Sequence, residues 1–301
     1  MLDSVSELNV FRHVTPVSPN TATGPVAAVY DQVDRDFSTI GPAVMMLSPA
    51  PELLAPCWAL LREALVSGSV PRWRKEIVAV SVSRTNGCEY DIAGHTVFLH
   101  LAGAPADAVE RNQELVRWAQ HGGPAPFSVG DTPEYVATAL ALHFVNRLVS
   151  ILLDPGLRPG GMRDGSAFDG APIARAIRAD HEPGESLALL DSVPTEGIPT
   201  WAGDSPAGPA YAALRDAARR GGFLLSERAR QTVQDAISRG DTTPVDEPGA
   251  RLAVLAGLAP GRITETDVKT WRSDKYTDHC LLHLFAYGAI TAIERIEHTL
   301  A

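Results

Sequence analysis

Four side chains that can carry a proton or act as a nucleophile lie within one stretch of twenty residues: Glu76, Cys88, Asp91 and His95. Cys88, Asp91 and His95 are three and four residues apart, which places them on one face of an α-helix. His95 would then lie one turn beyond Asp91, where a carboxylate can hydrogen-bond an imidazole and raise its basicity. A thiol, two carboxylates and an imidazole are sufficient for acid–base or thiol chemistry.

The flanking residues predict two helices that would bring these side chains together. An Asn-Gly pair at 86–87 separates an expected helix over 71–83 from another over 88–101, because glycine commonly ends a helix. Glu76 would face the second helix across this hairpin. Cys88 is expected in the first turn of the second helix, where the helix dipole and free N–H groups lower the pKa of a thiol.

Each of the four residues also has a purely structural interpretation. Cys88 can be a small buried apolar residue, and Glu76 can be a solvated charge on a helix. Asp91 and His95 can form a structural pair one helical turn apart. The functional interpretation therefore depends on whether the four side chains meet.

The rest of the sequence is also patterned as helices, because apolar residues recur at steps of three and four and no run of short alternating strands is found. A stretch rich in Gly and Pro, 154–170, predicts a linker or a long surface loop. Further helices are expected over 53–66, 105–120, 133–153, 173–179, 187–190, 207–219, 226–239, 250–258, 264–271 and 276–300.

The two halves of the chain resemble each other. The sequence WALLREA at 58–64 is similar to YAALRDA at 211–217, and LAG at 101–103 recurs at 255–257, with offsets of 153 and 154 residues. A nearly constant offset favours a duplication, whereas chance similarity between Ala- and Leu-rich helices is the alternative.

The expected domains are therefore an N-terminal repeat over 20–153, the linker over 154–170 and a C-terminal repeat over 171–301. At an offset of 154 residues, the second repeat is expected to lack the candidate site, because the four positions are occupied by Arg230, Thr242, Val245 and Gly249.

Composition excludes several classes of protein. Lys and Arg number 26 against 36 Asp and Glu, so the net charge is −10, and an acidic chain without a long basic run is not expected to bind nucleic acid or a membrane surface. Cys57, Cys88 and Cys280 cannot build a disulfide framework. The N-terminus lacks the apolar core of a secretion signal, and polar residues interrupt the apolar stretch 135–153. We therefore expect a cytoplasmic protein with reduced thiols.

The spacing Glu-x11-Cys-x2-Asp-x3-His resembles the active-site signature Glu-x11-Cys-x2-Cys-x3-His of the alkylhydroperoxidase D and carboxymuconolactone decarboxylase superfamily. The flanking segments 74–90 and 95–103, and the later 144–148, also resemble its peroxidase-related branch. The resemblance covers roughly residues 25–153. It implies an all-α fold, here with two tandem repeats, and a homo-oligomer of trimers or hexamers.

The resemblance also implies roles for the matching residues. In the peroxidases, the second cysteine attacks peroxide and the first closes a disulfide with it, while the glutamate and histidine relay protons. Cys88 matches the first cysteine, Glu76 the glutamate and His95 the histidine, but Asp91 stands where the second cysteine would be. A carboxylate can form neither a sulfenic acid nor a disulfide.

Three functional hypotheses follow. The first is a cofactor-independent acid–base enzyme, of decarboxylase, isomerase or lyase type, that acts on a small organic metabolite. In it His95 transfers the proton, Asp91 orients His95 or acts as a base, Glu76 relays protons and Cys88 lines the pocket. The second is a thiol-dependent peroxidase that uses Cys88 alone. The third is a degenerate binding or assembly paralogue.

Two other groups of residues contain the side chains that bind metals. His279 and His283 are one helical turn apart, a common spacing of metal ligands, but without an intervening glutamate a polar stripe on the last helix is favoured. His95 and His100 diverge on a helix, which argues against a shared ion with Asp91. We expect neither a metal nor a cofactor, since nucleotide-binding and G-x-S-x-G motifs are also missing.

Overall fold

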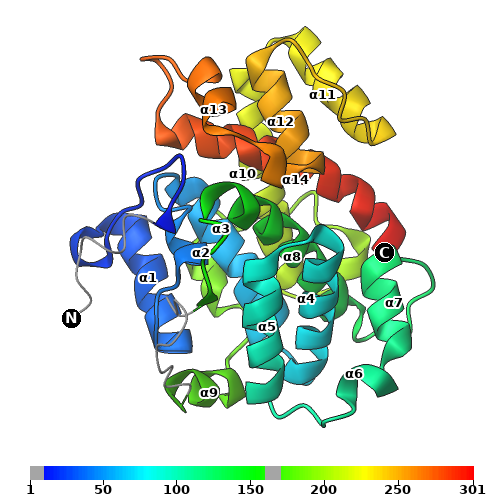
Figure 1. Cartoon of the computed structure of the whole chain (residues 1–301). Helices are drawn as coiled ribbons and strands as arrows, with labels where there is room; N and C mark the ends of the chain where they lie inside the picture. Colours follow the sequence, from blue (N-terminus) through cyan, green and yellow to red (C-terminus); the bar gives the residue numbers. More distant parts are fainter. Residues whose placement is uncertain (1–9, 160–170) are drawn as a thin grey trace.

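Helices form almost all of the regular structure in the computed structural model, which describes residues 10–159 and 171–301 (Figure 1). Within those ranges the only bridge of β type is an isolated antiparallel one between Phe11 and Leu153. The expected all-α class is confirmed. The α-helices are α1 (Gly24–Phe37), α2 (Pro42–Met45), α3 (Pro51–Leu61), α4 (Arg72–Asn86), α5 (Glu89–Leu101), α6 (Ala108–Arg111), α7 (Gln113–His121), α8 (Thr132–Leu152), α9 (Ala171–Arg178), α10 (Ala207–Arg219), α11 (Glu227–Arg239), α12 (Pro248–Leu258), α13 (Glu265–Trp271) and α14 (Asp278–Leu300).

The hairpin of α4 and α5 is fixed by local sequence. Gly87 adopts a left-handed conformation with φ of 63° and ends α4, and its N–H bonds to the carbonyls of Ser83 and Arg84. Glycine reaches this conformation without the steric cost that a Cβ brings. Cys88 follows as the N-cap of α5. The chain therefore reverses within two residues, and α4 and α5 pack side by side.

The helix expected over 105–120 is interrupted. Asn112 has φ of −116° and ψ of 35°, outside helical geometry, and lies between α6 and α7. Its side-chain nitrogen donates to the carbonyl of Ala108 at 2.7 Å. Asparagine commonly competes with the helical backbone in this way, which explains why one apolar periodicity covers two helices.

The order of packing is repeated along the chain, and the fold of two tandem repeats is confirmed. α4 packs on α5 in the first half as α11 packs on α12 in the second, and α4 and α11 both end at a left-handed glycine. Helices at matching positions also meet across the halves, α3 with α10 and α8 with α14 (Figure 1). The domain boundaries stay a prediction, and of the expected linker residues 160–170 lie outside the described residues.

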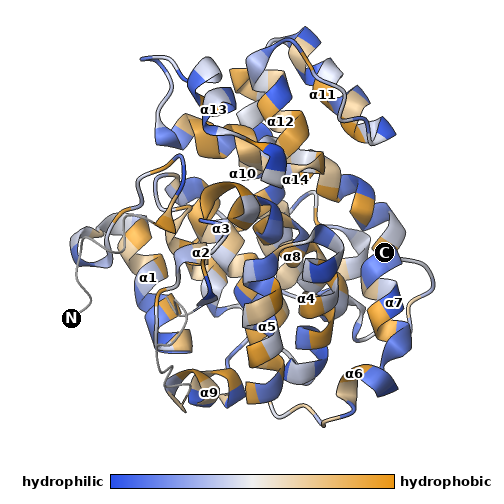
Figure 2. Cartoon of the chain, in the orientation of Figure 1, coloured by the Kyte–Doolittle hydropathy of each residue, from blue (hydrophilic) through white to orange (hydrophobic). Residues whose placement is uncertain are grey.

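Helix α8 is the central helix on which both halves pack. It contacts α4 and α3 of the first half and α10 and α14 of the second, and Figure 2 shows its apolar residues inside the bundle. Among the described helices, it alone has the length and apolar composition to cross a membrane. However, 89 % of its most apolar stretch is buried inside the protein, as expected of a core helix.

Candidate active site

The hairpin of α4 and α5 brings all four predicted residues together, and all four side chains are buried. Glu76 lies on α4, Cys88 caps α5, and Asp91 and His95 lie one turn apart on α5. A buried charged residue is costly unless it is paired. The partners of these side chains therefore decide what the cluster can do.

Glu76 and His95 form an ion pair across the hairpin. His95 Nδ1 lies 2.7 Å from Glu76 Oε2, and Arg72 Nε donates to the other carboxylate oxygen at 2.6 Å. Burial raises the pKa of Glu76, but the charges of Arg72 and His95 outweigh burial and hold it below its ordinary value. Burial lowers the pKa of His95, but Glu76 and then Asp91 outweigh it and hold the pKa above its ordinary value. Both shifts favour the ionised pair, a carboxylate and an imidazolium.

Asp91 does not form the expected hydrogen bond with His95. Its Oδ2 instead accepts from Cys88 Sγ at 3.2 Å and from Asn146 Nδ2 at 2.6 Å. Asn146 comes from α8 and holds the carboxylate away from the imidazole. Burial raises the pKa of Asp91, and the charge of His95 and these hydrogen bonds oppose the rise. Asp91 thus acts on His95 through its charge, and Glu76 is the residue that orients the ring.

The expectation of an activated thiol at Cys88 is wrong. The residue is the N-cap of α5 rather than part of its first turn, and only 3 % of it is exposed. Burial, followed by the negative charge of Asp91, raises the pKa of Cys88 far above its ordinary value. Cys88 is thus a buried thiol that donates to Asp91, and its part in any reaction stays a prediction.

Sequence reasoning missed Arg72, although its position four residues before Glu76 is the spacing of an ion pair on a helix. The guanidinium also lies over the ring of Phe37, 5.6 Å from its centre. Arg72 Nη2 is buried, and no hydrogen-bond partner for it exists in the described part of the chain. His95 Nε2 likewise has no hydrogen bond to residues 10–159 or 171–301. Two polar atoms of the cluster thus have no hydrogen-bond partner among the described residues.

A second buried histidine lies behind the cluster. His143 on α8 has Nδ1 3.1 Å from Asn86 Nδ2, and Asn86 also donates to Asn146 at 2.9 Å. Burial, followed by the charge of Arg147, lowers the pKa of His143 well below its ordinary value. The environment of His143 therefore favours the neutral imidazole, whereas that of His95 favours the charged one.

These opposite shifts predict opposite pH dependences of stability. The pKa of His95 in the folded chain is raised above its ordinary value of 6.5. Its contribution to the free energy of unfolding is therefore fully present below pH 6.5 and is lost as the pH rises through the folded pKa. The pKa of His143 in the folded chain is lowered below its ordinary value of 6.5. Its contribution to the free energy of unfolding is therefore present above pH 6.5 and is lost as the pH falls through the folded pKa.

His95→Gln is therefore expected to reduce the free energy of unfolding more at about pH 5.5 than at about pH 8.5, and His143→Gln to show the reverse. Urea unfolding of both variants and the wild type at the two pH values measures this. If each substitution reduced the free energy of unfolding equally at the two pH values, the two assigned charge states would be contradicted.

The residues at the corresponding positions of the second half have other surroundings. Arg230 turns back to donate to the carbonyls of Gly222 and Leu225. Thr242 and Val245 precede α12 rather than lie on it, and they line a crevice with no room for a water molecule. This region packs the fold and carries no equivalent cluster.

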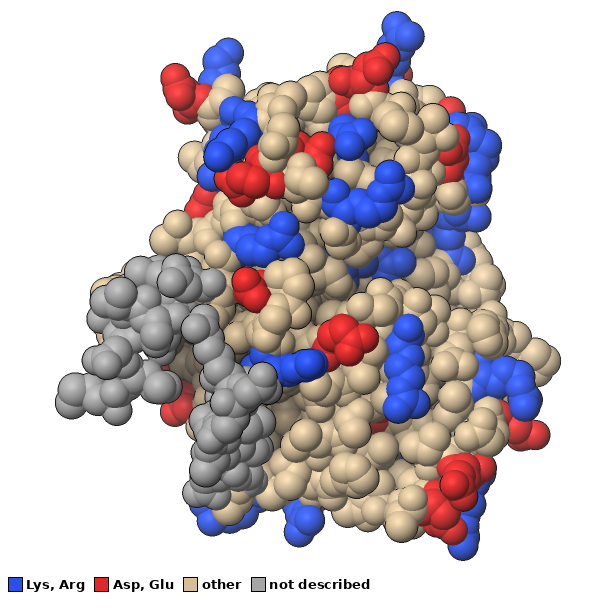
Figure 3. All heavy atoms as spheres, in the orientation of Figure 1, with Lys and Arg blue, Asp and Glu red and all other residues tan. Residues whose placement is uncertain are grey.

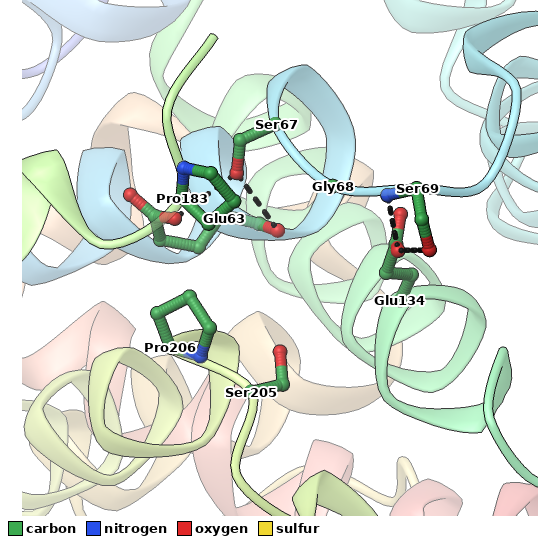
Figure 4. Close-up of a pocket in the computed structure, with 8 residues that line it drawn as sticks. All are labelled: Glu63, Ser67, Gly68, Ser69, Glu134, Pro183, Ser205 and Pro206. Atoms are coloured by element: carbon green, nitrogen blue, oxygen red, sulfur yellow. Dashed lines mark hydrogen bonds between the residues drawn. The ribbon is translucent and has the colours of Figure 1, made fainter.

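A cavity of about 430 Å³ lies away from the cluster, between the two halves (Figure 4). Its two carboxylates, Glu63 and Glu134, already have several donors each: Glu63 accepts from Arg62 and Ser186, and Glu134 from Lys75. Such saturated carboxylates hold the fold together and are poor candidates for catalysis. The lining residues are Glu63, Ser67, Gly68, Ser69, Glu134, Pro183, Ser205 and Pro206.

The face shown in Figure 3 carries Lys and Arg interspersed with Asp and Glu. A surface of mixed charges produces no strong field of one sign over that face.

Two comparisons with known proteins agree with this geometry. The model of the carboxymuconolactone decarboxylase family matches residues 51–121, which include the whole hairpin of α4 and α5. The chain is also 36 % identical, over 325 aligned positions, to a protein of Mycobacterium tuberculosis named alkyl hydroperoxide reductase Rv2159c. That alignment covers 94 % of this chain and 93 % of the relative.

Proposed function

The chain belongs to the alkylhydroperoxidase D-like and carboxymuconolactone decarboxylase superfamily, and from this premise we propose that it is a cofactor-independent acid–base enzyme. Its substrate is a small organic metabolite that bears a carbonyl group, and its reaction is a decarboxylation, an isomerisation or a related lyase step. The observation that carries the proposal is the Glu76–His95 ion pair, in which Nε2 has no partner among the described residues. No other residue of the cluster is equally suited to exchange a proton.

In this mechanism His95 is the general acid and base. Glu76 holds Nδ1 and leaves Nε2 to deliver a proton to the substrate and to take one back. Asp91 lies on the same face of α5, and its charge adds to the stability of the imidazolium. Cys88 donates its S–H to Asp91 and takes no part in bond making. In an isomerisation His95 takes a proton back from the substrate, whereas in a decarboxylation, which consumes one proton, it takes the replacement proton from water.

Arg72 supports a carbonyl-bearing substrate. Proton transfer beside a carbonyl places negative charge on its oxygen, and a donor aimed at that oxygen stabilises the transition state. Arg72 Nε is committed to Glu76, but the buried Nη2 has no partner in the part of the chain that the structure describes. Exclusion of water strengthens such an interaction.

The test is proton exchange in deuterium oxide. Wild-type protein is incubated with a panel of small keto acids and unsaturated lactones, and proton NMR follows both deuterium incorporation and loss of carbon dioxide. Incorporation by the wild type that His95→Gln lacks supports the proposal. Failure of every carbonyl compound to exchange above the rate without enzyme counts against it.

A peroxidase is the second candidate, because the relative is named an alkyl hydroperoxide reductase. It would have to use Cys88, and the burial and raised pKa of this thiol oppose that role. Labelling with iodoacetamide across pH distinguishes the two. Cys88 is expected to label slowly at every pH below 9, and rapid labelling at acidic pH would favour the peroxidase.

Location and assembly are part of the proposal. The three cysteines, Cys57, Cys88 and Cys280, form no disulfide with one another, which supports the cytoplasm. Membership of a superfamily of trimers and hexamers supports a homo-oligomer. Sedimentation of the purified chain measures its assembly directly.

A further inference from the structure

Two histidines of the last helix and one glutamate of the first half meet at a single point. His279 and His283 project from the first two turns of α14, and Glu52 from the first turn of α3. His283 Nε2 lies 2.8 Å from Glu52 Oε1, and His279 Nε2 contacts the same oxygen. All three potential ligand atoms lie within 4.8 Å of one another.

We propose that Glu52, His279 and His283 bind a divalent transition-metal ion. Two imidazole nitrogens and one carboxylate oxygen are the ligands by which proteins bind zinc and ferrous iron. Magnesium and calcium prefer all-oxygen sites and are not expected to bind here. The ion would take the place of the two hydrogen bonds to Glu52, with small adjustments of the side chains.

Exposure of the three side chains gives the ion an entry path. The side chain of His279 is 47 % exposed and that of Glu52 30 %, whereas that of His283 is 8 % exposed. The site is thus closed on the side of His283 and open to solvent on the side of His279. Three protein ligands and an open side are typical of sites in which water completes the coordination.

The neighbouring side chains of Asp278 and Cys280 already accept hydrogen bonds from other residues, so they add no ligand to the three. Asp278 accepts from the backbone N–H of Thr15 at 2.7 Å and from Arg272 at 2.8 Å. Cys280 Sγ accepts from Thr277 Oγ1 at 3.7 Å. His283 Nδ1 is buried and has no partner in the described ranges, so no second group orients this ring. Affinity is therefore expected to be lower than at a structural zinc site.

The consequence is a bridge between the two repeats, because Glu52 belongs to the first and both histidines to the second. A ligand that binds only the folded chain raises its stability in proportion to RT ln(1 + [L]/Kd). Zinc is therefore expected to raise the melting temperature, and the rise should depend on all three side chains.

The experiment is calorimetric titration of the purified full-length chain with Zn²⁺, with thermal unfolding measured in parallel. Wild type is expected to bind one ion per chain, and Glu52→Gln and His279→Gln to lose at least about tenfold in affinity. His279 is the most exposed ligand, so its replacement tests the site with the least risk to the fold. Cys280→Ser is the matched control, since it lies between the two histidines and should bind like the wild type.

Three outcomes would overturn the proposal: no binding to wild type, equal binding to Glu52→Gln and His279→Gln, or loss of binding in Cys280→Ser alone. Titration with Mg²⁺ completes the test, because a surface that merely collects cations would bind Mg²⁺ as well as Zn²⁺.

Discussion

His95→Gln is expected to lower kcat for the acid–base reaction by about 10²- to 10⁴-fold, the usual contribution of a general acid or base. Glutamine keeps a polar side chain of similar length but carries no titratable proton. The loss should fall on kcat, since proton transfer occurs in the transition state. Turnover in the deuterium-exchange assay measures it.

The matched control for this variant is His100→Gln. His100 lies on the same helix but is exposed, so its replacement should leave both turnover and folding unchanged. Circular dichroism of the two variants separates loss of catalysis from loss of structure. Full activity of His95→Gln would remove His95 from the mechanism and the acid–base proposal with it.

Glu76→Gln should act through the imidazole rather than on the substrate. Glu76 is the largest cause that raises the pKa of His95, so its neutral replacement should move the pH–rate profile to lower pH as well as lower its height. A profile that falls in height without moving would reduce Glu76 to a packing role.

Asp91→Cys is expected to consume peroxide at least about tenfold faster than the wild type. This corresponds to an activation free energy that is lower by about 1.4 kcal/mol. Asp91 Oδ2 lies 3.2 Å from Cys88 Sγ, so the introduced thiol would lie within reach of Cys88. It would attack the peroxide, release water or an alcohol and become a sulfenic acid. Cys88 would then close a disulfide with loss of water, and an added dithiol would reduce it.

The assay is consumption of hydrogen peroxide and of an organic hydroperoxide under excess dithiol. Asp91→Ser is the control, since it removes the carboxylate without adding a thiol, and it should stay inactive. Peroxide consumption by the wild type at the rate of Asp91→Cys would show that Cys88 is sufficient, in favour of the peroxidase. An inactive Asp91→Cys variant would show that this site cannot support the family's redox step.

The parts of the site that could be predicted from sequence are those with local causes. Gly87 ends α4 because its conformation needs no partner elsewhere, and the spacing of Cys88, Asp91 and His95 follows from helical geometry alone. The expected hydrogen bond between Asp91 and His95 does not form, because Asn146, 55 residues away in the sequence, donates to the Asp91 carboxylate instead. No local pattern carries that information.

For the same reason, the sequence alone could not show that Glu52 lies beside the two histidines of α14. It is 231 residues from His283, and only the packing of the two halves brings α3 near the start of α14. The apolar periodicity continues across Asn112 and so predicts one helix over 105–120, whereas the backbone at Asn112 leaves helical geometry and separates α6 from α7. The expectation of an activated thiol at Cys88 is wrong because the residue is buried, and a single sequence does not reveal burial.

The covalent joining of two similar repeats changes what mutation can do to each. In a symmetric dimer of identical chains, a substitution appears in both copies of a site at once. Here α11 and α12 could exchange a cluster of proton-carrying side chains for apolar packing while α4 and α5 kept theirs. If the first half carries out the proposed chemistry, selection constrains its site residues, whereas the second half is constrained by packing alone, so the two halves can diverge at different rates.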